Sequence, residues 1–129
     1  MDKYYYSDGS TSSGLDGSKL LHRVGGPAIE GSNGTKEWYL NGECHREDGP
    51  AVVWADGNKH WYLNRKLHRV DGPAIEWTNG HKVWYLNGEK YTEEQFNKIL
   101  KKVNKMCMAL QLTDPREWVR ELGRKRSKE

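Results

Sequence analysis

Residues 67–88 decide the fold of this chain, and they read Leu67-His68-Arg69-Val70-Asp71-Gly72-Pro73-Ala74-Ile75-Glu76-Trp77-Thr78-Asn79-Gly80-His81-Lys82-Val83-Trp84-Tyr85-Leu86-Asn87-Gly88. Nearly the same sequence occurs twice upstream. A shift of 23 residues superposes these equivalent positions: His22, His45 and His68; Pro27, Pro50 and Pro73; Gly34, Gly57 and Gly80; Trp38, Trp61 and Trp84. A fixed period of this kind is typical of stacked repeats. The sequence therefore predicts three full repeats within one domain of 129 residues.

Each repeat consists of two short extended runs joined by residues that favour a turn. The first runs are residues 27–31, 50–54 and 73–77, and the second runs are residues 36–40, 59–63 and 82–86. Between them lie Asn33-Gly34, Asp56-Gly57 and Asn79-Gly80, dipeptides that favour a two-residue hairpin turn in which both residues have positive φ. We therefore expect an antiparallel stack of β-hairpins.

Alternation along the runs predicts two faces of the sheet. The face expected to form the core carries Trp38, Leu40 and their equivalents from the second runs, together with Ile29, Val52, Trp54, Ile75 and Trp77 from the first runs. The other face is expected to carry a ladder of tyrosines with alanines and polar residues, namely Tyr39, Tyr62, Tyr85, Ala28, Ala51, Ala74, Glu30, Glu37, His60 and Glu76.

The repeats are joined by the motif His-Arg-x-Asp-Gly-Pro, whose residue types also occur in catalytic and metal sites. Equivalent histidines should lie two strand spacings apart, roughly 9–10 Å, which is too far for them to share one metal ion. We therefore interpret the motif as a structural turn in which Arg or His bonds the backbone, Asp48 or Asp71. Arg65 stands where the other units have Gly after Asn, so we expect local irregularity there.

The two ends of the chain depart from the repeat. Residues 1–20 are interpreted as a degenerate N-terminal half-repeat that caps the stack, and its strand at 4–6 as an exposed edge through which a second copy could pair. Residues 92–129 are interpreted as a basic helical segment and tail. Its first helix opens with the capping box Thr92-Glu93-Glu94-Gln95, and a second helix is expected from Thr113 to Leu122.

The first predicted helix is amphipathic. Its apolar side, expected to close the end of the β-stack, carries Phe96, Ile99, Leu100, Val103, Cys107 and Leu110. Its opposite side carries a lysine stripe, defined as Lys98, Lys101, Lys102 and Lys105. Such a stripe is typical of a solvated helix face, and it could also bind an anionic partner with help from Arg116 and Arg120.

Charge and composition narrow the classes of function. The net charge is −1 for residues 1–91 and +4 for residues 92–129, so attraction to a polyanion is expected only in the C-terminal part. The sequence has neither an apolar run long enough to span a membrane nor a secretory signal, which predicts a cytoplasmic protein with Cys44 and Cys107 as reduced thiols. No phosphate-binding glycine loop, activated nucleophile, cofactor site or metal site stands out.

The sequence of the repeats is similar to that of a known family. The pattern Gly-x-x-x-Trp-Tyr-Leu-Asn-Gly, followed by His-Arg-x-Asp-Gly-Pro-Ala, resembles MORN-type repeats in a variant found in large phages and other large DNA viruses, and the resemblance covers residues 21–91. It implies a ribbon of β-hairpins that serves as an interaction surface for proteins or, in some members, lipids. It implies no catalysis.

The sequence thus predicts a mainly β protein with C-terminal helices, and three functions remain open. The first is a non-enzymatic interaction protein, of viral or phage origin, that binds and modulates or inhibits a host or defence protein. The second is a nucleic-acid-binding protein, and the third is a His-dependent metal hydrolase or nuclease. The candidate partner-binding residues are Tyr39, Tyr62, Tyr85, Lys98, Lys101, Lys102, Lys105, Arg116 and Arg120.

Overall fold

The computed structural model describes residues 1–109, with side chains up to Lys105. This part of the chain forms short strands followed by one helix. The elements are β1 Lys3–Tyr5, β2 Thr11–Ser12, β3 Ile29–Glu30, β4 Lys36–Glu37, β5 Tyr39–Leu40, β6 Glu43–Cys44, β7 Val52–Val53, β8 Lys59–His60, β9 Tyr62–Leu63, β10 Lys66–Leu67, β11 Ile75–Glu76, β12 Lys82–Leu86, β13 Glu89–Tyr91 and α1 Glu93–Ala109.

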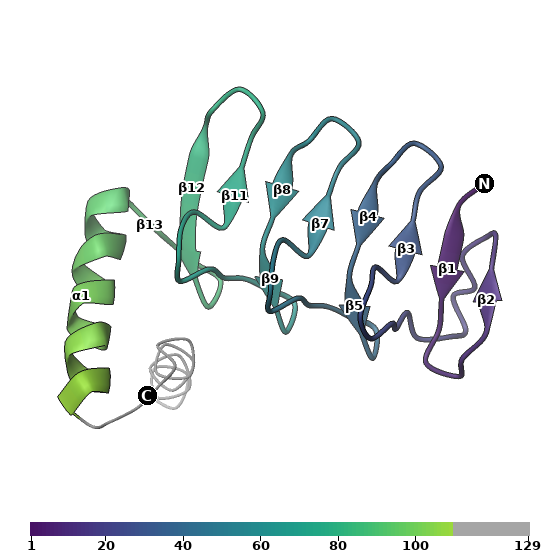
Figure 1. The fold of residues 1–129 in the computed structure, drawn as a ribbon, viewed down its shortest axis with the longest axis horizontal. Helices are drawn as coiled ribbons and strands as arrows, with labels where there is room; N and C mark the ends of the chain where they lie inside the picture. Colours follow the sequence, from purple (N-terminus) through teal and green to yellow (C-terminus); the bar gives the residue numbers. More distant parts are fainter. Residues whose placement is uncertain (110–129) are drawn as a thin grey trace.

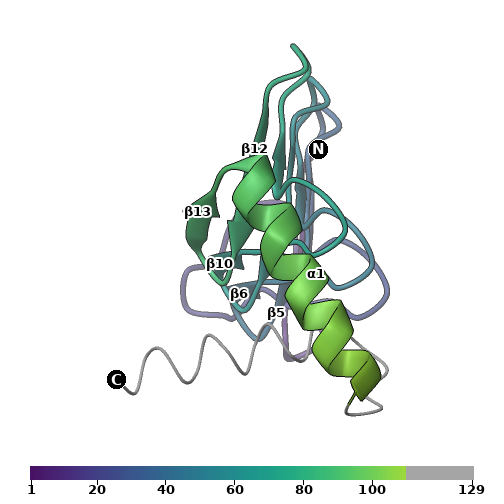
Figure 2. The ribbon, with the colours of Figure 1, turned by 90° about the vertical axis from the view of Figure 1, so that its left-hand side faces the viewer.

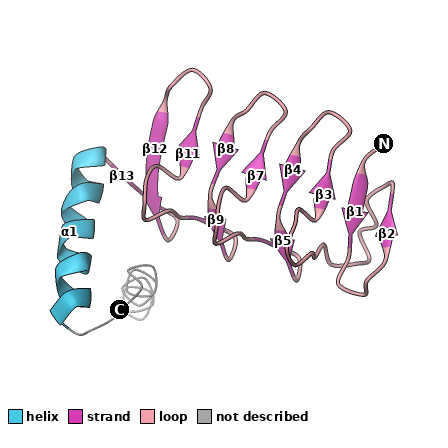
Figure 3. Cartoon of the chain, viewed as in Figure 1, coloured by secondary structure: helices cyan, strands magenta, loops and turns pink. Residues whose placement is uncertain are grey.

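The main sheet has the strand order β13-β12-β11-β8-β7-β4-β3-β1-β2, and all its pairs are antiparallel. Three hairpins therefore stand side by side along the molecule, one for each repeat (Figures 1 and 3). Two further small hairpins, β5-β6 and β9-β10, lie at the opposite ends of the repeats from the long loops. The predicted stack of antiparallel hairpins with a C-terminal helix is confirmed, whereas the second predicted helix lies outside the described residues.

The loops that contain Asn33-Gly34 and its equivalents are not two-residue turns. In the first loop the Gly31 amide donates to the Thr35 carbonyl at 2.7 Å and the Gly34 amide donates to the Gly31 carbonyl at 3.0 Å. Gly34 has a φ of 97°, and Asn33 is not among the residues with positive φ. This is the three-residue hairpin loop, a type I turn followed by one left-handed glycine. The prediction of two positive-φ residues in this turn is wrong.

The extra loop residue changes which side chains share a face. The register pairs Ile29 with Glu37, Val52 with His60 and Ile75 with Val83. Because side chains alternate along a strand, a shift of one residue moves a whole run to the other face. The predicted grouping of faces is therefore wrong. The alanines, Glu30 and Glu76 share the face of Trp38, Trp61 and Trp84. The face of the tyrosines is shared by Ile29, Val52, Trp54, Ile75 and Trp77.

The two-residue turns occur instead after the Leu of each second run. Both central residues have positive φ there: Asn41 (50°) and Gly42 (81°), Asn64 (49°) and Arg65 (71°), Asn87 (51°) and Gly88 (82°). The flanking pairs Leu40–Glu43, Leu63–Lys66 and Leu86–Glu89 are equivalent. Arg65 therefore adopts the left-handed conformation without altering the turn, so the expected irregularity is conformational strain rather than a different path of the chain.

One face of the sheet, which we call the arginine face, is covered by the segments that join the repeats. The guanidinium groups of Arg46 and Arg69 lie 3.9 Å from the ring centroids of Trp38 and Trp61, and Arg23 lies 4.0 Å from that of Tyr5. The alanines beneath them are completely buried; they are Ala28, Ala51 and Ala74. A Cβ at Gly49 would lie 2.9 Å from Arg46 Cζ, and Gly26 and Gly72 lie in the same way against Arg23 and Arg69, so glycine at this position leaves room for the guanidinium group.

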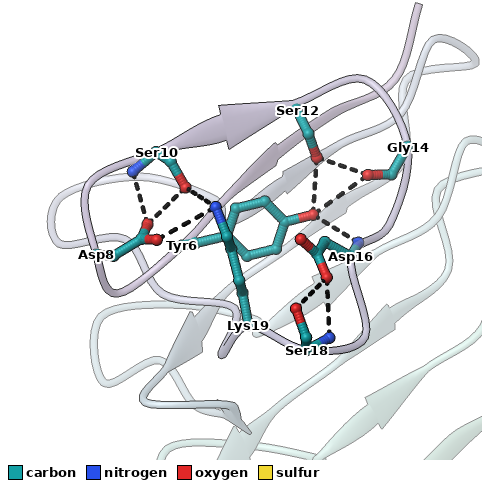
Figure 4. A network of polar contacts seen from close by, with 8 residues as sticks. All are labelled: Tyr6, Asp8, Ser10, Ser12, Gly14, Asp16, Ser18 and Lys19. Atoms are coloured by element: carbon teal, nitrogen blue, oxygen red, sulfur yellow. Dashed lines mark hydrogen bonds and ion pairs between the residues drawn. The ribbon is translucent and has the colours of Figure 1, made fainter.

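The N-terminal segment caps the stack. β1 pairs with β3 on one side and with β2 on the other, so residues 4–6 do not form a free edge, and the predicted dimerisation edge at this strand is wrong. The edge is the two-residue β2, which presents too little backbone for stable pairing with a second copy. Tyr6 is buried behind it, and its hydroxyl contacts Ser12 Oγ at 2.8 Å and accepts from the Asp16 amide at 2.9 Å (Figure 4).

The other end of the stack is closed by α1, as predicted (Figures 1 and 2). The capping box is formed: the Gln95 amide donates to Thr92 Oγ1 at 3.1 Å, and the Thr92 amide donates to Gln95 Oε1 at 3.0 Å. Phe96 and Val103 are buried with Leu86 of β12. The partly buried residues packed against this cluster are Val70, Trp84, Tyr91, Ile99 and Leu100.

Candidate functional site

The three equivalent histidines have a structural role. Each Nδ1 accepts the backbone amide of the Asn that begins the next two-residue turn, at 2.9 Å for His22 and His45 and 3.0 Å for His68. An accepting Nδ1 is the ring nitrogen that carries no proton. The partner amides belong to Asn41, Asn64 and Asn87. This arrangement confirms the interpretation of the motif as a turn that joins consecutive repeats.

The arginines and aspartates of the same motif bond each other and the backbone. Arg46 Nε donates to Asp48 at 2.8 Å, and its Nη1 donates to the Pro50 carbonyl at 3.1 Å. The hydrogen bond from Arg46 lowers the pKa of Asp48. Arg69 repeats both contacts with Asp71 and Pro73. These charged groups are therefore occupied in holding the inter-repeat segment against the sheet.

Cys44 lacks the environment of an activated thiol. Burial raises its pKa to about 12, and the Glu37 carboxylate acts in the same direction. A nucleophilic cysteine needs the opposite shift, because the thiolate is the reactive form. Cys44 lies opposite Tyr39 in the small β5-β6 hairpin, so it acts as a packing residue, as predicted from its equivalence to Leu67.

The tyrosine ladder is half-buried in the sheet. Tyr39, Tyr62 and Tyr85 occupy equivalent positions in the three repeats, and each is partly exposed. The Tyr39 hydroxyl donates to Glu37 Oε1 at 3.1 Å. Burial raises the pKa of both Tyr39 and Tyr62, so these side chains remain protonated and uncharged over the whole physiological range. These two tyrosines therefore contribute no charge to their face of the sheet.

The lysine stripe lies on α1 and not on the sheet that carries the tyrosines. All four lysines of the stripe are exposed on α1, on the side turned away from its buried apolar residues, and Lys98 pairs with Glu94 at 3.4 Å. The tyrosines lie in the sheet, so the structure places the two predicted sets on separate surfaces. Arg116 and Arg120, which were predicted to assist the stripe, lie outside the described residues.

The sequence did not predict a cluster of aromatic side chains on the face of the sheet that carries the tyrosines. His60 lies between Trp54 and Trp77, with ring centroids at 4.3 Å and 5.5 Å and both rings edge-on to it, and Tyr62 is 6.2 Å away. Both tryptophans are 38% exposed although they carry large apolar rings. Both ring nitrogens of His60 are buried without a hydrogen-bond partner, and burial lowers its pKa. We call this group the aromatic cluster and its side of the sheet the aromatic face.

Comparison of the repeats with one another provides the signal that could have revealed the cluster. The arginine face is nearly identical in every unit, with Trp38, Trp61 and Trp84 at one position and Lys36, Lys59 and Lys82 at another. Three positions that differ between units in size and polarity lie at or beside the aromatic cluster. They are Gly31, Trp54 and Trp77; Thr35, Asn58 and His81; and Glu37, His60 and Val83. These three sets of residues give the aromatic face of each repeat a different chemistry.

Comparisons with known proteins give no further identification. No family model, curated protein or solved structure matches this chain. Within residues 1–109, no helix is long and apolar enough to cross a membrane. No group of three or more His, Cys, Asp or Glu side chains in the described part of the chain is arranged to hold a metal ion.

Proposed function

We propose that this protein is a non-catalytic binding protein that engages a partner protein through the aromatic face. The observation that carries the proposal is the aromatic cluster: two tryptophans remain 38% exposed on either side of a histidine whose nitrogens are desolvated and unpaired. Burying the exposed part of each ring would give a partner a substantial hydrophobic gain. Nothing in the fold requires these rings, because the first hairpin has Gly31 at the same position.

The chemistry of this surface favours a protein partner. Tryptophan and tyrosine are enriched among the residues that dominate the energy of protein interfaces, and such residues are usually surrounded by polar groups that exclude water. Thr35 and Asn58 lie beside the tryptophans, and each uses its side chain to accept an amide of the next loop, from Ala55 and Thr78. The loops of neighbouring hairpins are thereby fixed relative to one another, so the surface is organised before binding.

Nucleic acid is less well supported as the partner. Stacking of bases on aromatic rings normally acts together with cations that neutralise phosphates. The lysines of the second runs, Lys36, Lys59 and Lys82, have the register of the arginine face, and the lysine stripe is on α1. Within the described strands and helix, the lysines therefore lie away from the aromatic cluster.

Catalysis is also not part of the proposal. The histidines, arginines and aspartates that suggested an enzyme are bonded within the inter-repeat segments, and the pKa of the Cys44 thiol is raised. We extend the proposal to the origin suggested by the resemblance to viral MORN-like repeats. In this view the protein acts in the cytoplasm of an infected cell and modulates a host or defence protein.

The test is affinity capture with the full-length chain and a Trp54→Thr/Trp77→Thr double variant, followed by identification of the captured proteins. Threonine maintains strand propensity while it removes the ring. We expect a partner that the wild-type protein captures and the double variant does not, and that binds the purified wild-type protein directly.

A matched control changes the opposite face of the same hairpins. Lys59→Thr/Lys82→Thr alters two exposed residues on β8 and β12, and it should capture the partner as well as the wild-type protein does. Thermal unfolding of all three proteins shows whether each is folded. Equal capture by the wild-type protein and a folded Trp54/Trp77 variant would refute the proposal.

A further inference from the structure

The two faces of the sheet differ in charge, although residues 1–91 are nearly neutral. One row of cross-strand partners on the arginine face alternates in sign across most of the sheet. In spatial order it is Lys3, Glu30, Lys36, Val53, Lys59, Glu76 and Lys82. Opposite charges that face each other across strands are stabilising, so these lysines have a role within the sheet.

The aromatic face has a different charge pattern. By register and alternation its strand residues include the carboxylate of Glu37, and Asp2 precedes β1 on the same side, where it accepts the Ser32 amide at 2.8 Å. The cation that the described strands place on this face is Lys90, which is paired with Tyr85 at the end of the sheet next to α1. Glu37 is therefore the charged residue that the described strands place beside the aromatic cluster.

Glu37 is the carboxylate nearest to the cluster in the register of the sheet. It lies directly opposite Val52, and Trp54 is two residues further along the same run, which makes Glu37 and Trp54 diagonal neighbours about 7–8 Å apart at Cα. His60 lies opposite Val52 on the other side. Because burial lowers the pKa of His60, the ring is neutral at physiological pH and does not repel a cation.

The arginine face shows how this sheet binds a guanidinium group. In each repeat an arginine lies over an aromatic ring and bonds a carboxylate: Arg46 over Trp38 with Asp48, Arg69 over Trp61 with Asp71 and Glu76, and Arg23 over Tyr5 with Glu30. The aromatic face offers the ring of Trp54 and, on the neighbouring strand, the carboxylate of Glu37, whose Oε1 accepts the Tyr39 hydroxyl. Among the described residues, the arginines that lie over rings are those of the arginine face.

We propose that the partner protein anchors itself with an arginine side chain that lies over Trp54, paired with Glu37, while Trp77 extends the apolar contact. This inference rests on the proposed function and specifies the partner's chemistry at the same surface. A guanidinium group fits because it is planar, stacks on aromatic faces and keeps its charge at every physiological pH. A lysine would satisfy the charge but not the stacking.

The test uses the full-length protein labelled with ¹⁵N and a short peptide that contains two arginines. The matched peptide has citrulline in place of arginine, which has nearly the same shape but no charge. We expect the arginine peptide to shift the indole N–H signals of Trp54 and Trp77 in NMR spectra, with an affinity about fivefold to tenfold higher than that of the citrulline peptide.

A second comparison isolates the carboxylate. Glu37→Gln should weaken the arginine peptide roughly twofold to fivefold, whereas Glu43→Gln should leave its affinity unchanged. Glu43 is paired with Leu40 and lies on the other side from Glu37. The Glu43→Gln substitution therefore removes the same charge without changing the aromatic face. The result that overturns the inference is equal binding of the arginine and citrulline peptides, or no shift of either indole signal.

This outcome is distinguishable from failure of the proposed function. If the captured partner depends on Trp54 and Trp77 but the arginine peptide shows no preference over citrulline, the binding face is retained and the cationic anchor is rejected. If folded Trp54/Trp77 variants capture every partner that the wild-type protein captures, both proposals fail.

Discussion

Replacement of Arg65 by Gly should stabilise the protein. Arg65 is an exposed residue with a φ of 71° in the two-residue turn between β9 and β10. The equivalent turns have Gly42 and Gly88 at this position with φ of 81° and 82°. The Arg65 amide donates to the Cys44 carbonyl at 3.0 Å, a bond that glycine can also make. The substitution therefore removes strain and loses no described contact.

The magnitude follows from two opposing terms. A left-handed conformation costs a non-glycine residue roughly 1–2 kcal/mol. Glycine gives the unfolded chain more freedom, which offsets about 0.4–1 kcal/mol of that gain. We expect a net increase of about 0.5–1 kcal/mol in the free energy of unfolding, and a rise of roughly 2–5 °C in Tm for a domain of this size.

The assay is urea unfolding followed by tryptophan fluorescence, with two control variants. Arg65→Ala removes the same charge and side chain but retains a Cβ, so its stability should stay within about 0.5 kcal/mol of the wild-type value. Gly88→Ala introduces the strain where a Cβ has room, 3.7 Å from the nearest Lys66 carbon, and should cost about 1 kcal/mol. If Arg65→Ala stabilises as much as Arg65→Gly, the backbone explanation is refuted.

Three further predictions concern other parts of the chain. Stability should decrease as the pH falls below about 6.5, because the pKa of His60 is lowered in the folded protein while the unfolded chain binds the proton. His60→Val, which introduces the residue found at Val83, should reduce this pH dependence in unfolding experiments between pH 7 and pH 5. Arg46→Lys keeps the charge but loses the stack on Trp38, and should cost roughly 1–2 kcal/mol in urea unfolding. Thr92→Ala removes the acceptor of the Gln95 amide, and we expect a loss of about 1 kcal/mol together with fraying of the first turn of α1 in hydrogen exchange.

Much of the fold was predictable because the sequence repeats. A residue type that returns every 23 positions must satisfy the same environment each time, and this identified the hairpins and the structural role of His45 and Arg46. The break in the period identified the start of α1, because Tyr91 replaces the expected histidine and Thr92 begins a capping box. These predictions depend on local chemistry that does not change with the position of the strand.

The grouping of side chains into faces could not be predicted in the same way. Asn33-Gly34 is compatible with a two-residue loop and with a three-residue loop that ends in a left-handed glycine, and the two differ by one residue in register. The structure has the second loop, so Trp54 and Trp77 share a face with His60 rather than with Trp38. The aromatic cluster was missed for this reason, since its members were assigned to opposite faces.

The joint between repeats also determines how the length of this molecule can change. Each repeat is attached to the next by the same bonds: the histidine accepts from the next Asn amide, and the arginine amide donates to the next tyrosine carbonyl, at 3.2 Å for Arg23, 3.0 Å for Arg46 and 3.2 Å for Arg69. A unit that carries both halves of this joint can be inserted between two others without redesign of either neighbour. Duplication of residues 45–67 would thus lengthen the sheet by two strands, about 10 Å, and leave both caps intact. Such a chain can become longer or shorter by whole repeats. The repeats that differ from one another show where the chain has become specialised.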